Sequence, residues 1–265
     1  MCRLLAYWGA PVPVADLVVR SPHSLLHQCT DARFQSSGCE NPDGWGIGWY
    51  VDGIDDPFRY RTATPMPLDH DGVANLDGLS SFRFVAHVRH KSPGSPTEVA
   101  GNAPFVSGRW LFAHNGFVEG FRDGVRDRLF AQLSPSRQET LAGDADSELI
   151  FGLILDRLDA GEEAAIALAE VLEPLVAIGG KYNVVLTDGR QLLATCLGNS
   201  LYLRFPPGLR TGNVIASEPY DDAPVVPMGH DTERGEWQQL ADGTLVELDD
   251  DNGSETSQLF EGARS

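Results

Sequence analysis

Cys2 is the first residue whose type and position could do chemistry, because it directly follows the initiator methionine in MCRLLAYWGA. Removal of Met1, which a small side chain at position 2 should permit, leaves a thiol and a free α-amine on one residue. An α-amine has a reference pKa of about 7.7–8.0, so near pH 7 a useful fraction is neutral and can accept the thiol proton. Such a residue supplies both nucleophile and base for attack on an acyl carbon. The alternative interpretation is that Cys2 is a small residue at the start of an edge strand.

Attack on an acyl carbon needs hydrogen-bond donors for the oxyanion, and losing one such donor typically costs about 10²–10³ in rate. The segment AHNG, residues 113–116, offers two candidates at the end of an apolar run. Asn115 carries a side-chain amide, and Gly116 lets a backbone N–H approach a ligand closely. Because Asn-Gly is also a common turn, this motif alone leaves a purely structural interpretation open.

Two charged residues suit the ends of an amino-acid substrate. Arg89, in HVRH at residues 87–90, leaves an apolar run and can form a bidentate pair with a carboxylate. Asp146, at the start of a helical segment, can bind an ammonium group. The alternatives are a surface salt bridge for Arg89 and a first-turn acid favoured by the helix dipole for Asp146. Together with the nucleophile and the oxyanion donors, the two residues describe a site for a γ-glutamyl group.

The strands that would position these residues are predicted from short apolar runs bounded by Gly, Pro and Asp. They are residues 2–8, 44–53, 58–64, 82–90 and 109–116. After the first strand, SPHSLLHQC predicts a helix start with Ser21 as N-cap and Pro22 at the first helical position. Two hairpins are predicted later in the chain, in YNVVLTDGRQLLATCLG and in WQQLADGTLVELD.

Two amphipathic segments in the middle of the chain predict helices. Apolar residues recur on one face of DADSELIFGLILDRLDAG and of EEAAIALAEVLEPLVAIGG. The order of strands, two adjacent helices and further strands does not fit regular βα alternation. It indicates an α+β fold or a layered α/β/β/α sandwich of antiparallel sheets. We predict a single domain over residues 2–248, followed at 249–265 by a disordered acidic tail.

The composition of the 265 residues is that of an ordinary globular protein, with 42% hydrophobic and 22% charged residues. A formal net charge of -18 argues against nucleic acid or an anionic membrane as the main partner. Neither a secretion signal nor a membrane span is expected, because no basic segment precedes an apolar run and no run reaches about twenty residues. The four cysteines form no CxxC pair, so they predict neither a disulfide scaffold nor a zinc site and favour the reducing cytoplasm.

Five motifs occur in an order that resembles the class II glutamine amidotransferases, which are N-terminal-nucleophile hydrolases. The motifs are MCRLLAYWG, DGWGIGW (43–49), HVR…PG…NAPF (87–105), AHNG (113–116) and DADSE (144–148). The resemblance covers roughly residues 2–220 and implies a four-layer α/β/β/α sandwich of two antiparallel sheets. It also implies that Cys2 is the nucleophile and that the partner is a small γ-glutamyl molecule. No cofactor or metal is expected.

The resemblance assigns roles to individual residues. Asn115 and Gly116 look like the oxyanion hole. Arg89 looks like the clamp for the glutamyl α-carboxylate, and Asp146 looks like the partner of its α-ammonium. Ser92 falls where many relatives have a threonine near the same carboxylate. The DGWG segment is expected to shape the loop beside the nucleophile rather than to do chemistry.

The chain departs from the pattern of the synthase-linked members at two places. Residues 102–105 are Asn-Ala-Pro-Phe where those members have Asn-Ala-His-Pro, and His90 replaces the tryptophan that commonly follows the arginine. By contrast, PF before GxWLxAHNG and ASEPYDD (216–222) resemble a branch that removes glutamate from γ-glutamyl-hercynylcysteine sulfoxide in ergothioneine biosynthesis. The alternatives are a stand-alone glutaminase or amidotransferase subunit, for which a partner synthase is possible, and a non-enzymatic binding protein on the same scaffold.

The remaining chemistry-bearing residues have mainly structural interpretations. His23 and His27 lie four apart, a spacing compatible with zinc, but no third ligand is apparent and amphipathic helix histidines are favoured. Cys29, Cys39 and Cys196 are expected to pack in the interior. Contacts to a quaternary ammonium on the leaving group are expected from ASEPYDD and from tryptophans, although core packing is favoured for each tryptophan singly. The tryptophans are Trp8, Trp45, Trp49 and Trp110.

Overall fold

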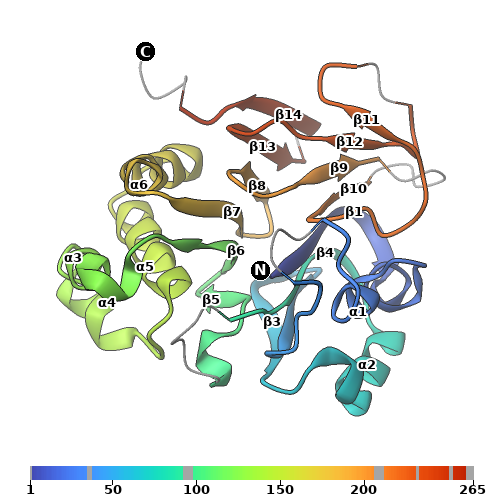
Figure 1. Ribbon diagram of the computed structural model, residues 1–265, viewed down its shortest axis with the longest axis horizontal. Coiled ribbons are helices and arrows are strands. Elements are labelled where there is room, and N and C mark those ends of the chain that lie inside the picture. The colour runs from blue at the N-terminus through green and yellow to red at the C-terminus, as the bar shows by residue number, and fades with distance from the viewer. Residues whose placement is uncertain are drawn as a thin grey trace.

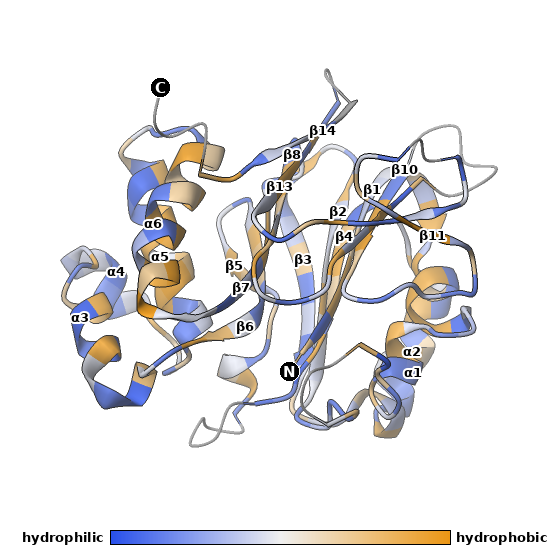
Figure 2. Cartoon of the chain, turned by 45° about the horizontal axis from the view of Figure 1, so that its top comes forward, coloured by the Kyte–Doolittle hydropathy of each residue, from blue (hydrophilic) through white to orange (hydrophobic). Residues whose placement is uncertain are grey.

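Two β-sheets stack face to face and carry helices on their outer faces (Figures 1 and 2). The computed structural model describes residues 2–34, 38–91, 98–205, 212–230, 233–250 and 253–260. The eight-stranded sheet runs in the order β11 (Val225–Pro227), β12 (Trp237–Gln239), β9 (Tyr202–Arg204), β10 (Gly212–Ala216), β1 (Arg3–Pro13), β4 (Ser80–Val88), β2 (Trp45–Val51), β3 (Ile54–Thr62). The six-stranded sheet runs β14 (Gly253–Gln258), β13 (Thr244–Asp249), β8 (Gln191–Cys196), β7 (Gly180–Thr187), β6 (Trp110–Val118), β5 (Phe105–Ser107).

Helices cover the two sheets from opposite sides. The α-helices are α1 (Leu25–Gln28), α2 (His70–Asn75), α3 (Arg126–Phe130), α4 (Pro135–Thr140), α5 (Asp146–Asp159) and α6 (Ala164–Ile178). Shorter 3-10 and π turns are η1 (Asp16–Arg20), η2 (Met66–Leu68), η3 (Leu76–Gly78), η4 (Val99–Gly101) and η5 (Phe121–Val125). Figure 2 shows α5 and α6 beside the six-stranded sheet and α1 and α2 beside the eight-stranded one. The predicted α+β fold, a four-layer α/β/β/α sandwich, is confirmed. Within the described residues, no helix is long and apolar enough to cross a bilayer.

The first strand shows why the N-terminal run is apolar throughout. Because side chains alternate along a strand, Leu4 and Ala6 enter the core that includes the second sheet, whereas Leu5 and Tyr7 join the core under α1. Both faces of β1 are therefore buried, as the continuous apolar run requires. Cys2 has the parity of Leu4 and so lies at the end of the strand on the side of the second sheet.

The local predictions in the middle of the chain are confirmed. The segment that begins DADSE forms α5, and the segment that begins EEAA forms α6. The Asp188-Gly189 turn joins β7 to β8 as an antiparallel hairpin, with Gly189 at a φ of 80°. The Asp188 carboxylate accepts the main-chain N–H groups of Arg190 and Gln191, which closes the turn.

The first helix begins three residues later than expected. Ser24, and not Ser21, is the N-cap of α1, and its hydroxyl accepts the N–H of His27. The Ser21 hydroxyl is used elsewhere, because it donates to the main-chain oxygen of Asp16 at the preceding turn. His23 therefore lies outside the helix that was expected to carry it.

The C-terminal region differs from two expectations. The segment predicted as one hairpin is divided, because β12 joins the first sheet beside β9 whereas β13 joins the second sheet beside β8. The tail predicted to be disordered from 249 contains β14, which pairs with β13 over Gly253–Gln258. β13 otherwise leaves an open sheet edge, and unpaired edge N–H and C=O groups favour the addition of a strand.

Candidate functional site

A small pocket lies where the two sheets and the N-terminus of α5 meet. It has a volume of about 30 Å³ and is lined by Cys2, Arg89, Gly116 and Asp146, among others. Cys2 precedes β1, Arg89 follows β4, Gly116 lies near the end of β6 and Asp146 begins α5. Four of the residues singled out in the sequence are thus brought to one place by four different elements.

The Cys2 sulfur lies against the main chain of its neighbouring strand end. Its Sγ is 3.4 Å from the donating N–H of His90 and 3.5 Å from the His90 carbonyl oxygen. Burial raises the pKa of the Cys2 thiol, and the His90 N–H and the Arg89 charge only partly oppose that shift. The thiol is therefore protonated near neutral pH, and a nucleophilic role requires a base that takes its proton.

Arg89 is held rigidly at the end of β4. Its Nη1 donates to Asn102 Oδ1 at 2.9 Å, and its main chain pairs with Gly44 and Asp43 of the DGWG segment. Gly44 has a φ of 106°, and a Cβ there would collide with the Asn102 side chain. The DGWG segment thus shapes the loop around the arginine, and the Asn-Ala-Pro-Phe segment supports the guanidinium through Asn102.

Asp146 ties the start of α5 to the end of β6. Its Oδ2 accepts the N–H of Val118 at 3.1 Å, and its Oδ1 accepts the N–H of Ser147 at 2.7 Å. These contacts fix the carboxylate at the rim of the pocket. The geometry leaves it able to receive a cation from the pocket, since it forms no ion pair with a described residue.

Asn115 is fully buried and, unlike its neighbours His114 and Gly116, is not among the residues that line the pocket. Its Nδ2 donates to Ser217 Oγ at 3.1 Å, and the same hydroxyl accepts the N–H of Leu4 at 3.0 Å. Ser217 therefore links the amide of Asn115 in the second sheet to β1 in the first sheet. A primary amide carries two N–H donors, so the bond to Ser217 orients Nδ2 and leaves one donor for another acceptor.

Packing requires a glycine at position 116, whether or not a ligand approaches it. A Cβ at this position would collide with the main-chain oxygen of Lys181 and with the ring of His114. His114 is itself fixed, because its two ring nitrogens lie 3.0 Å from Ser147 Oγ and 2.9 Å from the Lys181 oxygen. The end of β6 is thereby held against α5.

His87 also lines the pocket. It lies within the HVRH motif, but it was not among the predicted site residues. It is 2% exposed and lies against the main chain of His114. Burial, with the nearby charge of Arg89, lowers the pKa of His87 to about 3. The ring is neutral at physiological pH and places an uncharged polar surface beside Cys2.

The buried neutral His87 predicts an acid-sensitive fold. Between its ordinary pKa of 6.5 and about 3, the unfolded chain binds a proton that the folded chain does not, so acidification favours unfolding. The contribution approaches about 1.4 kcal/mol of unfolding free energy for each pH unit. His87→Gln should flatten the fall in urea-derived stability between pH 7 and pH 5, whereas His27→Gln, at an exposed histidine, should leave it steep. An unchanged slope in His87→Gln would contradict this assignment.

Other expectations concern residues that lie away from this pocket or outside the described residues. Ser92 lies outside the described residues. None of the four tryptophans lines this pocket as far as the structure is described. Trp45, for example, is fully buried and donates to Asp69. The expectation that tryptophans and ASEPYDD contact a leaving group therefore gains no support at this pocket.

The ASEPYDD segment serves the fold instead. Glu218 is fully buried, and its carboxylate pairs with Arg3 at 2.8 Å and with His23 at 2.8 Å. It also accepts the N–H groups of Arg33 and Phe34, so it fastens that loop beside β1. This ion cluster explains why His23 is buried, which corrects the expectation of an amphipathic helix pair.

Cys29 and Cys196 are buried as expected, whereas Cys39 is exposed.

Comparisons with known proteins bear on the family and the fold. Residues 16–259 match the family described as glutamine amidotransferases class-II. The chain is 35% identical over 251 residues to a γ-glutamyl-hercynylcysteine sulfoxide hydrolase of Mycolicibacterium smegmatis, covering 94% of this chain and 96% of the relative. It is 34% identical to the protein of the same name from Mycobacterium tuberculosis, covering 94% and 93%. A solved glutamine aminotransferase class-II domain protein from Silicibacter pomeroyi superposes with a TM-score of 0.68 at 23% identity, covering 97% of this chain and 99% of that one.

The sequence match and the structural likeness point the same way. The match spans most of the chain, and the superposition extends over both sheets and their helices. The resemblance noted from the five motifs is confirmed. This chain belongs to the class-II glutamine amidotransferases.

Proposed function

We propose that this protein hydrolyses a γ-glutamyl amide bond with Cys2 as nucleophile. The observation that carries the proposal is the convergence of a thiol, a guanidinium, a carboxylate and a strand-end N–H on one pocket. Arg89 pairs with the glutamyl α-carboxylate, and Asp146 pairs with the α-ammonium. The two opposite charges then hold the γ-carbonyl at the sulfur.

The reaction proceeds in two balanced steps. Cys2 Sγ attacks the γ-carbonyl carbon while the free α-amine of Cys2 takes the thiol proton, directly or through a water. Asn115 Nδ2 and the Gly116 N–H stabilise the oxyanion, and the carbon–nitrogen bond breaks as the proton passes to the leaving amine. Water then hydrolyses the thioester, which releases glutamate and restores the thiol.

The substrate is proposed from the relatives. Proteins at 34–35% identity over nearly the full chain carry the name γ-glutamyl-hercynylcysteine sulfoxide hydrolase. We therefore propose that sulfoxide as the preferred substrate, a role in ergothioneine biosynthesis, and glutamate as one product. A reducing cytoplasm suits an enzyme whose four cysteines are all free.

A direct comparison of substrates tests this proposal. The value of kcat/KM for γ-glutamyl-hercynylcysteine sulfoxide should exceed that for glutamine by about 10²-fold or more, because contacts to the larger leaving group add binding energy in the transition state. Glutamate release is measured for both substrates with one enzyme preparation. If glutamine equals or exceeds the sulfoxide, the alternative of a stand-alone glutaminase or amidotransferase subunit, with a possible partner synthase, replaces the proposal.

A further inference from the structure

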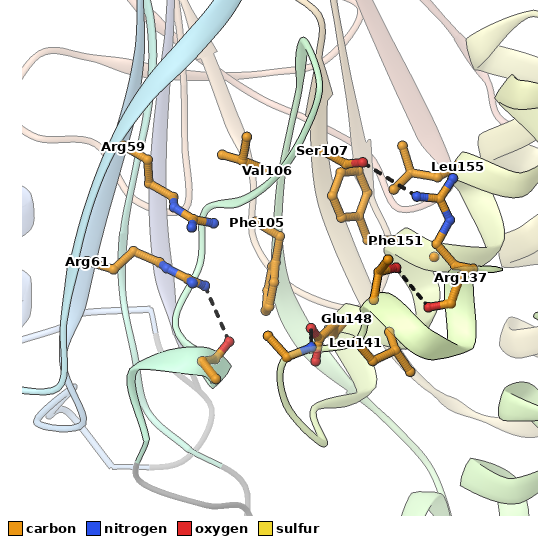
Figure 3. Close-up of a pocket in the computed structure, with 14 residues that line it drawn as sticks. Arg59, Arg61, Phe105, Val106, Ser107, Arg137, Leu141, Glu148, Phe151 and Leu155 are labelled. Atoms are coloured by element: carbon orange, nitrogen blue, oxygen red, sulfur yellow. Dashed lines mark hydrogen bonds between the residues drawn. The ribbon is translucent and has the colours of Figure 1, made fainter.

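A second, larger pocket adjoins the catalytic pocket. It has a volume of about 190 Å³, and Figure 3 shows Arg59 and Arg61 on one side, Arg137 on the opposite side and Phe105 between them. Phe151 and Leu155 of α5 add apolar surface. The pocket thus combines cationic and apolar walls.

The two pockets meet along three separate segments. Phe105 lines both. On η4, Ala100 lines the larger pocket and the next residue, Gly101, lines the catalytic one. On α5, Glu148 lines the larger pocket and the preceding residue, Ser147, lines the catalytic one. A group bonded to the γ-carbonyl carbon at Cys2 therefore has the larger pocket within reach past Phe105.

The charges of the larger pocket are only partly compensated. Arg137 is neutralised by Asp156 and Asp159, at 3.4 Å and 2.5 Å. The Glu148 carboxylate accepts the N–H groups of Ala142 and Gly143. Arg59 and Arg61, by contrast, form no ion pair with any described residue.

The two arginines of β3 differ in their contacts. Arg61 donates through Nη1 to the main-chain oxygens of Ala100 and Asn102, so it supports the loop that holds Arg89. Burial and the nearby charge of Arg59 lower the pKa of Arg61 to about 10, and the Glu148 carboxylate only partly opposes that shift. Arg59 is an exposed residue that lines the pocket, and partial desolvation of its guanidinium lowers its pKa. Arg61 is thus occupied by the loop and faces the Glu148 carboxylate, whereas the Arg59 guanidinium is available to an anion.

We propose that this pocket is the leaving-group subsite and that Arg59 binds a carboxylate carried by the leaving amine. The inference rests on the proposed γ-glutamyl hydrolysis and deepens it. The matching leaving amine has an apolar or aromatic part for Phe105 and Phe151 and a carboxylate for the guanidinium fork. Amino-acid derivatives belong to this class, whereas the ammonia released from glutamine leaves the subsite empty.

A pair of substrates that differ only in that carboxylate tests the inference. The probes are γ-glutamyl-S-benzylcysteine and γ-glutamyl-S-benzylcysteamine, and the readout is the ratio of their kcat/KM values. The wild-type protein should favour the carboxylate-bearing probe by about 10-fold or more. Arg59→Gln should bring the ratio close to one, and Arg59→Lys should retain part of the preference because it keeps the charge without the fork.

Arg128→Gln is the matched control, because this arginine is exposed on α3 and lines neither pocket. Its ratio should equal that of the wild type. If both probes are hydrolysed and Arg59→Gln leaves the ratio unchanged, the subsite is overturned while the hydrolase activity stands. If the folded wild-type protein hydrolyses neither probe nor any other γ-glutamyl amide, the proposed function itself is overturned.

Discussion

Cys2→Ala is expected to lower kcat for γ-glutamyl amide hydrolysis by about 10⁴-fold or more, because the thioester requires the Cys2 sulfur. The fold should persist, since Cys2 precedes β1 and, among the described residues, its side chain hydrogen-bonds only to the main chain of His90. Single-turnover glutamate release measures the loss, and calorimetry with the intact substrate should still detect binding. Cys39→Ala, at an exposed cysteine, should retain full activity. Residual hydrolysis above about 1% in Cys2→Ala would reject the sulfur as nucleophile.

The proposed mechanism also requires that Met1 is removed, so that the α-amine of Cys2 is free to act as the base. Because burial raises the pKa of the Cys2 thiol, no thiolate is available near neutral pH and the rate depends on a base. With the α-amine in that role, kcat/KM should fall as the pH drops through about 7.7–8.0, since the ammonium form accepts no proton. Intact mass of active protein should show that Met1 is absent. Full activity in protein that retains Met1 would contradict the amine as base.

Asn115→Ala is expected to lower kcat by about 10²–10³ with little change in KM, because one oxyanion donor is lost. In the structure Ser217 Oγ accepts one N–H of this amide, which leaves the second N–H for the oxyanion. Arg89→Ala and Asp146→Ala are expected to affect KM rather than kcat. Each leaves a charged end of the substrate unpaired and should mainly raise KM.

Steady-state kinetics of the three variants separate the two roles. A circular-dichroism melt of Asn115→Ala is needed beside them, because the residue is fully buried and joins the two sheets through Ser217. An effect of Asn115→Ala that lies in KM alone, or equal losses of kcat in all three variants, would contradict the division between chemistry and recognition.

Local patterns in the sequence determined much of this protein. The apolar run after Cys2 is a strand buried on both faces, the Asp-Gly pair closes the hairpin of β7 and β8, and the DADSE segment begins α5. Each of these rests on interactions between residues near in sequence, such as side-chain alternation, turn conformation and helix periodicity. Cys2, Arg89 and Asp146, which line one pocket, were likewise identifiable as candidates, because their types limit the chemistry they can do.

Only the tertiary structure decided the partners of distant segments. WQQLADGTLVELD has the local pattern of a hairpin, yet its two strands belong to different sheets, and β14 forms because β13 offers it an edge. The acidic ASEPYDD segment places Glu218 in a buried ion cluster, where charge pairing offsets the cost of burial. By its sequence, Arg59 is an ordinary residue of a predicted strand, with nothing to mark it as a site residue. It becomes a candidate for substrate recognition because β3, Phe105 and α5, which are separated along the chain, enclose one pocket beside Cys2.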